Sequence, residues 1–122
     1  MFNGASSIAK AGGLAVLSAV GQKENKKLVG YYINNAKFIK QNLLKLGFQV
    51  FGGENAPYIW VKNPNNLTSW EFFDKLLIET HVVGTPGSGF GVSGEGYLRL
   101  TSFGHRADIE KAVKSIQKNL KL

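Results

Sequence analysis

Residues 84–96 have the most unusual composition in the chain, because six of these 13 residues are glycine. Residues 89–94 match the spacing GxGxxG, but a dinucleotide-binding loop opens a helix after a strand, whereas here a strand is expected to follow the glycines. No lysine stands where a phosphate-binding loop requires it, and neither Ser88 nor Ser93 has the flanking glycines of a nucleophile elbow. Two interpretations stay open: a mobile surface loop, or a lid or wall over a bound ligand.

Arg99 is the side chain best suited to bind an anion, and it lies in the strand expected at residues 97–102. The alternating pattern of this strand directs Leu98 and Leu100 to one face and Arg99 to the other. A planar guanidinium fixed on a strand can hold a carboxylate through two parallel hydrogen bonds, and the neighbouring glycines leave room for a ligand. The alternative is that Arg99 forms a salt bridge at the surface of the sheet.

The other polar candidates have ordinary structural explanations, so these residues indicate no catalytic, metal-ligating or cofactor-binding group. Asn3 precedes a glycine and is typical of a turn or a helix start. Glu71 and Asp74 have the spacing of a charge arrangement in the first turn of a helix rather than that of a catalytic pair. His81 and His105 are isolated, and no lysine lies in a segment that would favour a Schiff base.

The composition is that of one globular domain with a real core. The 122 residues are 43% hydrophobic and 19% charged, with no cysteine and a formal net charge of +7. The lack of cysteine excludes disulfides and a closed zinc site, and no apolar run reaches the length of a membrane span, so no membrane contact is expected. Of the 15 basic residues 13 are lysine, which suits a solvated surface better than base contacts, so no nucleic-acid partner is expected.

Two helices are predicted at the start of the chain. Small residues recur at helical spacing over residues 5–19, which predicts a helix that packs closely against another backbone, with its partner outside this chain. A second helix is predicted over residues 23–46, where an apolar stripe is accompanied by lysines on a solvated face. Gly47 then supplies a left-handed cap, and Phe48 folds back on the last turn.

The pattern changes from helical to alternating after this cap. Residues 48–61 predict an antiparallel hairpin whose turn contains Gly52 and Gly53. Thr68, with Glu71 three residues later, predicts the capping box of a short helix.

Three further elements complete the predicted fold. Residues 82–83 are expected to form a short strand, residues 97–102 a longer strand, and residues 109–120 a terminal amphipathic helix. The order α, α, β, β, α, β, β, α predicts the α/β class. The expected architecture is a small antiparallel or mixed sheet with helices on one face, preceded by a linking helix.

Five segments of the chain, together with the second helix from residue 22 onwards, form a distinctive combination. They lie at residues 2–6, 53–60, 69–77, 82–91 and 94–99. The most specific parts are NAPY at 55–58 and SWEFFDK at 69–75. The combination resembles the LL-diaminopimelate aminotransferases, pyridoxal phosphate enzymes of the fold type I group, over nearly the whole chain.

The resemblance implies the α+β small domain of a fold type I aminotransferase, with pyridoxal 5'-phosphate as the cofactor. It implies amino-group transfer between LL-diaminopimelate and 2-oxoglutarate in lysine biosynthesis. The enzyme would be a homodimer in the cytoplasm, or in a plastid if the source is a plant or alga. Arg99 matches the arginine that binds the substrate α-carboxylate. Asn3 matches an asparagine that reaches from one subunit toward the distal end of the substrate in the other subunit's site.

The resemblance also implies that this chain holds part of an active site. Residues 1–30 correspond to the end of the large domain and the start of the linking helix, and residues 31–122 to the C-terminal small domain. The aldimine lysine, the aspartate that pairs with the pyridine nitrogen and the phosphate-binding residues of the family belong upstream of Met1. The chain alone is therefore expected neither to retain the cofactor nor to transaminate. The alternative is a stand-alone, catalytically inactive small domain that acts as a binding or assembly module.

Overall fold

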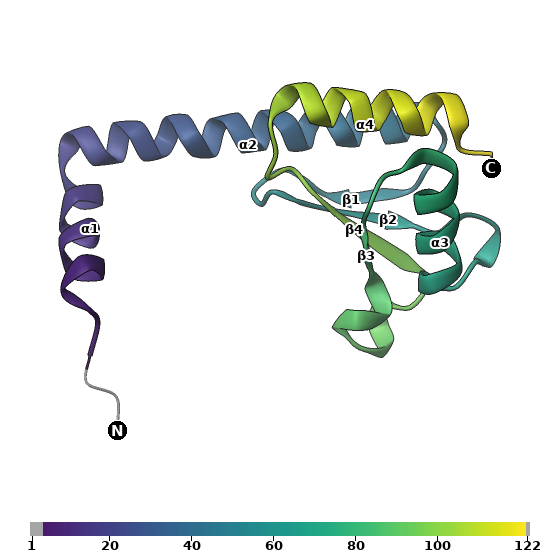
Figure 1. The fold of residues 1–122 in the computed structure, drawn as a ribbon, viewed down its shortest axis with the longest axis horizontal. Helices are drawn as coiled ribbons and strands as arrows, with labels where there is room; N and C mark the ends of the chain where they lie inside the picture. The colour runs from purple at the N-terminus through teal and green to yellow at the C-terminus, as the bar shows by residue number, and fades with distance from the viewer. Residues whose placement is uncertain (1–3, 122) are drawn as a thin grey trace. The chain divides into compact units, whose positions relative to one another are not determined.

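The structure, a computed structural model, describes residues 4–121 (Figure 1). It begins with helix α1 (Ser7–Leu17) and helix α2 (Ala19–Lys45). The chain forms two compact units, Met1–Tyr31 and Tyr32–Leu122, and α2 contributes to both of them. The assignment of the first 30 residues to a larger domain stays a prediction.

In the first unit the two helices are separated by Ser18 alone. Ser6 Oγ accepts a hydrogen bond from the Ala9 N–H at 3.2 Å, and Ser18 Oγ accepts one from the Gly21 N–H at 3.1 Å, so a serine caps the start of each helix. A Cβ on Gly21 would lie 2.1 Å from the carbonyl oxygen of Ala15, so this close approach requires glycine. No residue of α1 is buried, and the close packing expected of its small residues against a partner stays a prediction.

The second unit contains a four-stranded antiparallel sheet with the strand order β1-β2-β4-β3. Strands β1 (Val50–Gly52) and β2 (Tyr58–Lys62) form the predicted hairpin. Strand β4 (Tyr97–Thr101) pairs with β2, and β3 (Thr85–Pro86) pairs with β4 at the edge. The sheet is therefore purely antiparallel, which decides between the two predicted alternatives.

The strand predicted at residues 82–83 is wrong, because the chain joins the sheet two residues further on. Helix α3 (Ser69–Thr80) ends at His81, which adopts a left-handed conformation with a φ of 57°. Val82 then packs against the hydrophobic core, and strand β3 follows. Pro86 is buried in β3, where a proline is tolerated because an edge strand has a ladder partner on one side only.

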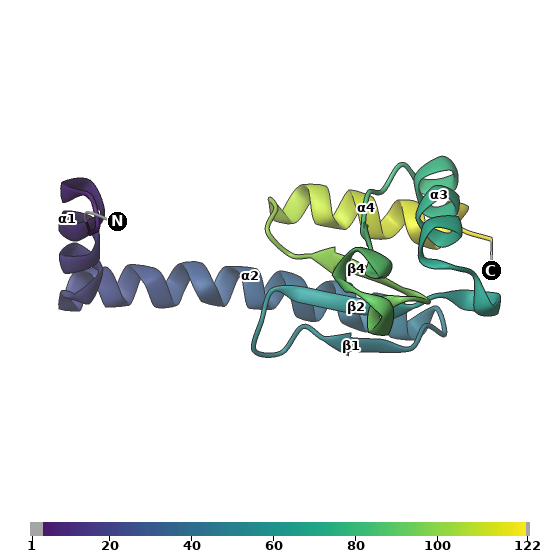
Figure 2. The same ribbon diagram turned by 90° about the horizontal axis from the view of Figure 1, so that it is seen from below.

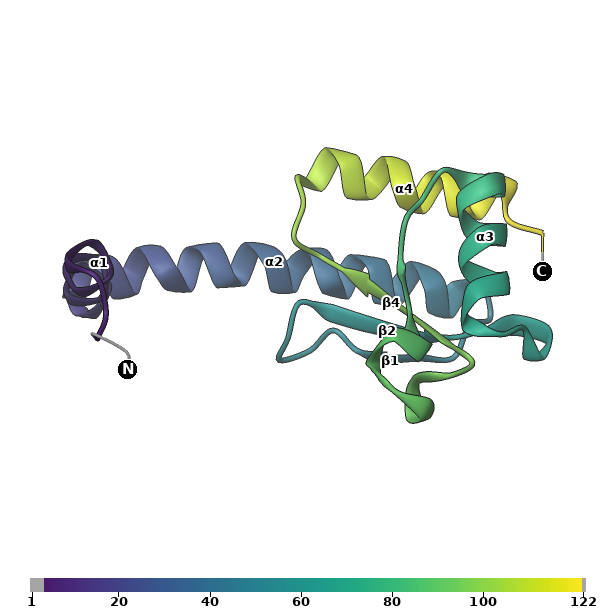
Figure 3. The ribbon, with the colours of Figure 1, turned by 60° about the horizontal axis from the view of Figure 1, so that its bottom comes forward.

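The C-terminal part of α2, α3 and α4 (Arg106–Asn119) cover one face of the sheet (Figures 1 and 2). This confirms the predicted fold class, a small α/β unit with helices on one face. The hydrophobic core between the layers consists of Ala36, Ile39, Leu43, Phe48, Ile59, Val61, Phe72, Leu76, Leu98, Leu100, Ile109, Val113 and Ile116. The residues that follow β3 project on the side of the sheet away from α2 and α4 (Figure 3).

The local start and stop signals of the sequence are confirmed. Thr68 Oγ1 accepts a hydrogen bond from the Glu71 N–H at 3.3 Å, and the Glu71 carboxylate accepts one from the Thr68 N–H at 2.8 Å, which forms the predicted capping box. Gly47 adopts a φ of 87° after α2, and the Phe48 N–H donates to the Leu43 carbonyl at 3.2 Å. Among residues 4–121, no helix is long and apolar enough to span a membrane.

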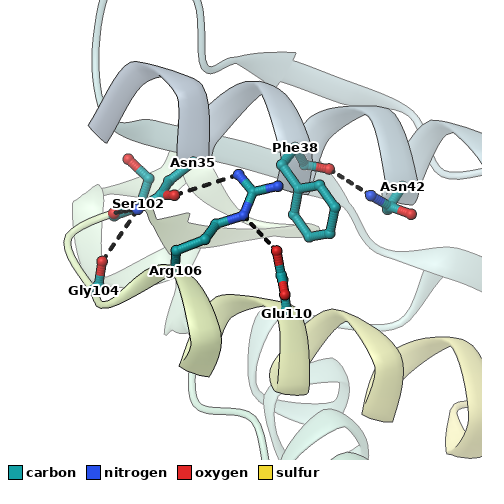
Figure 4. Close-up of polar contacts among 7 residues, drawn as sticks. All are labelled: Asn35, Phe38, Asn42, Ser102, Gly104, Arg106 and Glu110. Carbon is teal, nitrogen blue, oxygen red and sulfur yellow. Dashed lines mark hydrogen bonds and ion pairs between the residues drawn. The ribbon is translucent and has the colours of Figure 1, made fainter. Parts of the chain in front are cut away.

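Asn35 of α2 fixes the segment that leaves strand β4 (Figure 4). Its side chain is fully buried, and its Nδ2 donates to the Gly104 carbonyl at 3.1 Å. Arg106 donates from Nη1 to Asn35 Oδ1 at 3.5 Å, and its Cζ lies 3.9 Å from the ring centroid of Phe38. The end of β4 is therefore held by polar contacts to a helix, a few residues after Arg99.

Candidate functional site

Arg99 lies in the middle of β4, on the face of the sheet that the helices leave open. In the antiparallel register it stands opposite Trp60 of β2 and Thr85 of β3, so a strand flanks it on each side. Its neighbours Leu98 and Leu100 are 1% and 9% exposed on the inner face, whereas Arg99 is half-buried. The alternation of β4 therefore fixes the guanidinium on the open face.

Two aromatic rings lie against the guanidinium of Arg99. Its Cζ is 4.5 Å from the ring centroid of Tyr58 and 4.2 Å from that of Phe90, distances at which a cation is attracted to the ring face. The ring of Trp60 packs edge to face with Phe90, with the two centroids 5.3 Å apart. Sequence reasoning missed both ring contacts. The placement of Tyr58 and Trp60 on one strand face gave a partial signal, whereas Phe90 stands alone among glycines.

Arg99 forms no ion pair with a carboxylate of residues 4–121. The ion pairs in this part of the chain join Lys40 with Glu54, Lys75 with Glu79, Arg106 with Glu110 and Lys111 with Asp108. The surface salt bridge considered as an alternative is therefore not formed there. The in-plane N–H groups of Arg99 stay available for two parallel hydrogen bonds to an external carboxylate.

The glycine-rich segment forms two successive 3-10 turns, Gly87–Phe90 and Val92–Gly94. A Cβ on Gly87 would lie 2.1 Å from the carbonyl oxygen of Gly94, and a Cβ on Gly94 would lie 2.0 Å from that of Gly87. Gly91, between the two turns, has a φ of 103°. These three positions require glycine, as does Gly96 with its φ of 78°, which accounts for four of the six glycines in the segment.

Ser69 and Glu95 fasten this segment to the start of α3. The Ser69 N–H donates to Glu95 Oε1 at 2.7 Å, and the Ser88 N–H donates to Ser69 Oγ at 3.3 Å. The Ser69 N–H is the main reason why the pKa of Glu95 lies below the ordinary range of a glutamate, because the hydrogen bond stabilises the charged carboxylate. These hydrogen bonds fix the glycine-rich segment to the start of α3, beside Arg99.

A hollow of about 440 Å³ opens on the same face of the sheet, and Arg99 itself is not among the residues that line it. It is lined by Phe51, Trp60, Phe90, Ser93, Gly94 and Tyr97, so most of its wall is aromatic. Because Trp60 and Phe90 also belong to the ring cluster at Arg99, a ligand whose carboxylate binds Arg99 can extend along this apolar wall. A larger hollow of about 560 Å³ lies between α4 and residues 82–83, and neither Arg99 nor these rings line it.

Comparison with known proteins gives the family of this chain. The family model of aminotransferase class I and II matches residues 1–116. The chain belongs to the class I and II aminotransferases. As an aminotransferase chain it shares the fold of the C-terminal domain of the fold type I group.

The solved structures to which this aminotransferase chain is similar are much longer than it. L,L-Diaminopimelate aminotransferase from Chlamydomonas reinhardtii is 43% identical with a TM-score of 0.94, and the match covers 98% of this chain and 29% of that chain. The aromatic aminotransferase from Pyrococcus horikoshii is 27% identical with a TM-score of 0.79, over 85% of this chain and 28% of that chain. A Methanococcus jannaschii protein, 23% identical with a TM-score of 0.87, shares the fold over 99% of this chain and 32% of its own. The chain therefore spans under a third of each of these proteins.

The second predicted substrate-binding residue, Asn3, lies outside the described residues, so its role stays a prediction. The other polar candidates occupy structural positions. Glu71 is part of the capping box of α3, His81 ends the same helix, and His105 precedes the first turn of α4. Arg99 is therefore the candidate around which the described part of the chain builds a site.

Pyridoxal phosphate is expected in class I and II aminotransferases, and its Schiff base requires a suitably placed lysine. All 13 lysines of this aminotransferase chain lie among the described residues, and only Lys40 and Lys75 are partly buried. Each of these two ammonium groups lies 2.8 Å from a carboxylate, that of Glu54 or Glu79. Residues 4–121 do not fit a pyridoxal phosphate site, because they offer no enclosed lysine that lacks an ion-pair partner.

Proposed function

We propose that this chain is the C-terminal part of a pyridoxal phosphate-dependent aminotransferase that acts on LL-diaminopimelate and 2-oxoglutarate in lysine biosynthesis. The 43% identity with the Chlamydomonas reinhardtii enzyme over 98% of the chain supports this choice of substrate. Within the whole protein, this chain contributes the binding of the substrate α-carboxylate. The cofactor is held by residues that precede the matched segment.

The observation that carries the proposal is the environment of Arg99. The guanidinium is fixed on a central strand, two rings contact it, and no carboxylate of residues 4–121 neutralises it. A half-buried arginine without a charge partner is suited to a ligand that brings its own negative charge.

The geometry supports a specific role for Arg99 toward a bound amino acid or 2-oxo acid. Two parallel hydrogen bonds to the α-carboxylate fix both of its oxygen atoms, which orients the adjacent Cα and its substituent. The rings of Tyr58 and Phe90 keep water away from part of the guanidinium, and a lower local dielectric strengthens these hydrogen bonds.

Further parts of the proposal concern the whole protein. Asn3 contacts the distal end of the substrate in the active site of the other subunit, so the whole protein is a homodimer. The 122-residue chain alone neither retains pyridoxal phosphate nor transaminates. Turnover by the purified chain in the presence of pyridoxal phosphate would refute this last statement.

A chimera tests the proposal directly. This chain replaces the region that it matches in the Chlamydomonas reinhardtii enzyme, and amino-group transfer from LL-diaminopimelate to 2-oxoglutarate is measured. We expect an active chimera. We expect Arg99→Lys to lower its kcat/KM about tenfold to a hundredfold, because a lysine cannot make the forked contact.

Arg106→Lys is the matched control, since it makes the same chemical change at an arginine outside the site. The folded Arg106→Lys chimera is expected to keep its kcat/KM within about twofold. Unchanged kinetics of Arg99→Lys would remove Arg99 from the substrate site. A folded but inactive chimera would instead favour the alternative of a catalytically inactive binding or assembly module.

The reading frame before the Met1 codon provides an independent test. We expect an in-frame Ser-x-Ser-Lys segment followed by a glycine-rich stretch with arginine, as aminotransferases of this group carry. A genuine start signal at Met1 without such a segment would favour the stand-alone module.

A further inference from the structure

We propose that Tyr58 and Phe90 are positioning residues for Arg99, and that the glycine-rich segment serves to hold the Phe90 ring against the guanidinium. This inference rests on the proposed function, because it concerns how Arg99 meets a carboxylate. In this role the rings act through the arginine, and the double-mutant cycle below separates it from a direct contact of Phe90, which also lines the hollow, with the substrate.

The rings of Tyr58 and Phe90 both contact the guanidinium of Arg99. The Cζ atom of Arg99 lies over the rings of Tyr58 and Phe90 at 4.5 and 4.2 Å. The N–H donors of a guanidinium lie in its plane, so a ring against a face leaves the edge that a carboxylate needs accessible. A free arginine samples many rotamers, and contacts that restrict them lower the entropy lost when a ligand binds.

Burial does not explain the position of Phe90. The side chain is 49% exposed, so a large part of its ring gains nothing from the hydrophobic core. Its ring contacts are those with Arg99 and, at 5.3 Å between centroids, Trp60. Both contacts lie on the open face of the sheet, beside the hollow of about 440 Å³.

The backbone holds Phe90 in place. Phe90 ends the first 3-10 turn, and Gly91 follows it with a φ of 103°, a backbone conformation that side chains other than glycine rarely adopt. The mutual contact of Gly87 and Gly94 closes the base of the segment at a distance that no side chain allows. Ser69 Oγ donates to the Gly94 carbonyl at 3.4 Å and accepts from the Ser88 N–H at 3.3 Å, so this base is tied to α3. The segment projects on the side of the sheet away from α2 and α4 (Figure 3), and its Phe90 reaches Arg99 there.

A separate row of rings restrains Tyr58. Its ring centroid lies 5.8 Å from that of Phe103, which in turn lies 4.9 Å from that of Tyr32 in α2. Edge-to-face packing restrains each ring in this row. Arg99 therefore contacts one ring that the glycine-rich segment holds and one ring that a row of rings links to α2.

The experiment measures KM and kcat of chimera variants in which one ring is replaced by leucine, and of variants in which it is replaced by another aromatic residue. We expect Phe90→Leu and Tyr58→Leu each to raise KM about threefold to thirtyfold with kcat changed less than about twofold. Phe90→Tyr and Tyr58→Phe keep the ring and are expected to restore values within about twofold of the parent. Trp70→Leu is the control, because it removes an exposed ring of α3 that belongs neither to the contacts of Arg99 nor to the row of rings behind Tyr58.

A double-mutant cycle separates positioning from direct contact with the substrate. In the Arg99→Lys background, Phe90→Leu is expected to change KM by less than about twofold, because the group it positions is gone. An undiminished effect in that background would overturn the inference, since Phe90 would then act on the substrate itself. If Arg99→Lys lowers kcat/KM but neither leucine variant raises KM, the inference fails while the proposed function stands. If Arg99→Lys has no effect, both fail.

A second measurement on the 122-residue chain does not depend on catalysis. The side-chain NMR signals of Arg99 are expected to show the upfield shift caused by nearby ring faces, and Phe90→Leu and Tyr58→Leu are each expected to reduce it. Trp70→Leu, which removes an exposed ring away from this site, is expected to leave it in place. Arg99 signals at their random-coil positions in the parent chain would overturn the inference.

Discussion

On the inner face of the sheet Ile59, Val61 and Leu98 are at most 2% exposed, whereas on the outer face Tyr58 is 37% exposed and Arg99 is half-buried. Both sets of residues come from strands β2 and β4, at alternating positions. Because successive side chains point to opposite faces, one strand can supply core packing and a binding surface without sharing a residue between them. The comparison therefore predicts that substitutions on the inner face lower the stability of the chain, whereas substitutions on the outer face change the surroundings of Arg99.

The largest effect is expected from Leu98→Ala. The side chain is 1% exposed and lies in the core between the sheet and the helices, so its truncation is expected to destabilise the chain by about 2–5 kcal/mol. Chemical denaturation of the purified chain, followed by circular dichroism, measures this loss.

Arg99→Ala, one residue further along the strand, is the matched control. It removes contacts with partly exposed rings and is expected to change the free energy of unfolding by less than about 1 kcal/mol. Equal losses for the two variants would show that the two faces are not energetically separate.

Much of the fold around the inner face of the sheet could be predicted from the sequence, because the signals for its helices and strands are local. The capping box of Thr68 and Glu71, the left-handed Gly47 and the alternation of β2 each depend on a few neighbouring residues. The prediction of a strand at residues 82–83 was wrong because its position does not depend on local signals. The position of β3 depends on how far α3 carries the chain from the sheet edge, which no local pattern encodes.

The site could be predicted only in part, for the same physical reason. Arg99 was found because its strand alternates, and its role came from a family resemblance. The contact of Phe90 with Arg99 joins a loop residue to a strand residue through the folding of the glycine-rich segment. The contact of Gly87 with Gly94 that shapes this segment is also invisible in the sequence, where it appears only as a high glycine content.

The second prediction concerns Asn35, which belongs to the helical side. Asn35→Ala removes the side-chain amide that donates to the Gly104 carbonyl at 3.1 Å and to the Ser102 carbonyl at 3.4 Å. A buried polar group left without a partner costs about 1–3 kcal/mol, so a stability loss of this size or larger is expected. Asn34→Ala, at the exposed neighbouring position, is expected to stay within about 0.5 kcal/mol of the parent.

If Asn35→Ala keeps the ring-current shift of Arg99, the loss of stability leaves the outer face undisturbed, and the two faces are separate in this respect. A variant that loses both would show that Asn35 also holds the binding face, through the end of β4.

The third prediction concerns Gly87, which shapes the outer face. In Gly87→Ala the added Cβ would lie 2.1 Å from the Gly94 carbonyl oxygen, so the segment has to shift. A loss of about 1–3 kcal/mol is expected, with a reduced ring-current shift at Arg99. Gly89→Ala is the matched control, because a Cβ there meets no atom within 4 Å. Equal effects of both alanines would contradict the role of the Gly87 contact.

The smallest effect on stability is expected from Glu95, whose carboxylate ties the outer segment to α3. The Ser69 N–H lowers the pKa of Glu95 in the folded chain, so the charged carboxylate adds stability above the ordinary glutamate pKa of the unfolded chain. That contribution is lost as the pH falls through the lowered pKa of the folded state. Thermal unfolding from about pH 7 to about pH 3 should therefore show Glu95→Gln less stable than the parent near neutrality and equal to it at the acid end. Glu24→Gln, at an exposed position of α2 that accepts no hydrogen bond from residues 4–121, controls for the general loss of a charge. A difference in stability between Glu95→Gln and the parent that stays constant over this pH range would mean that the carboxylate charge does not fasten the segment. The hydrogen bond from the Ser88 N–H to Ser69 Oγ would then be what holds the segment to α3.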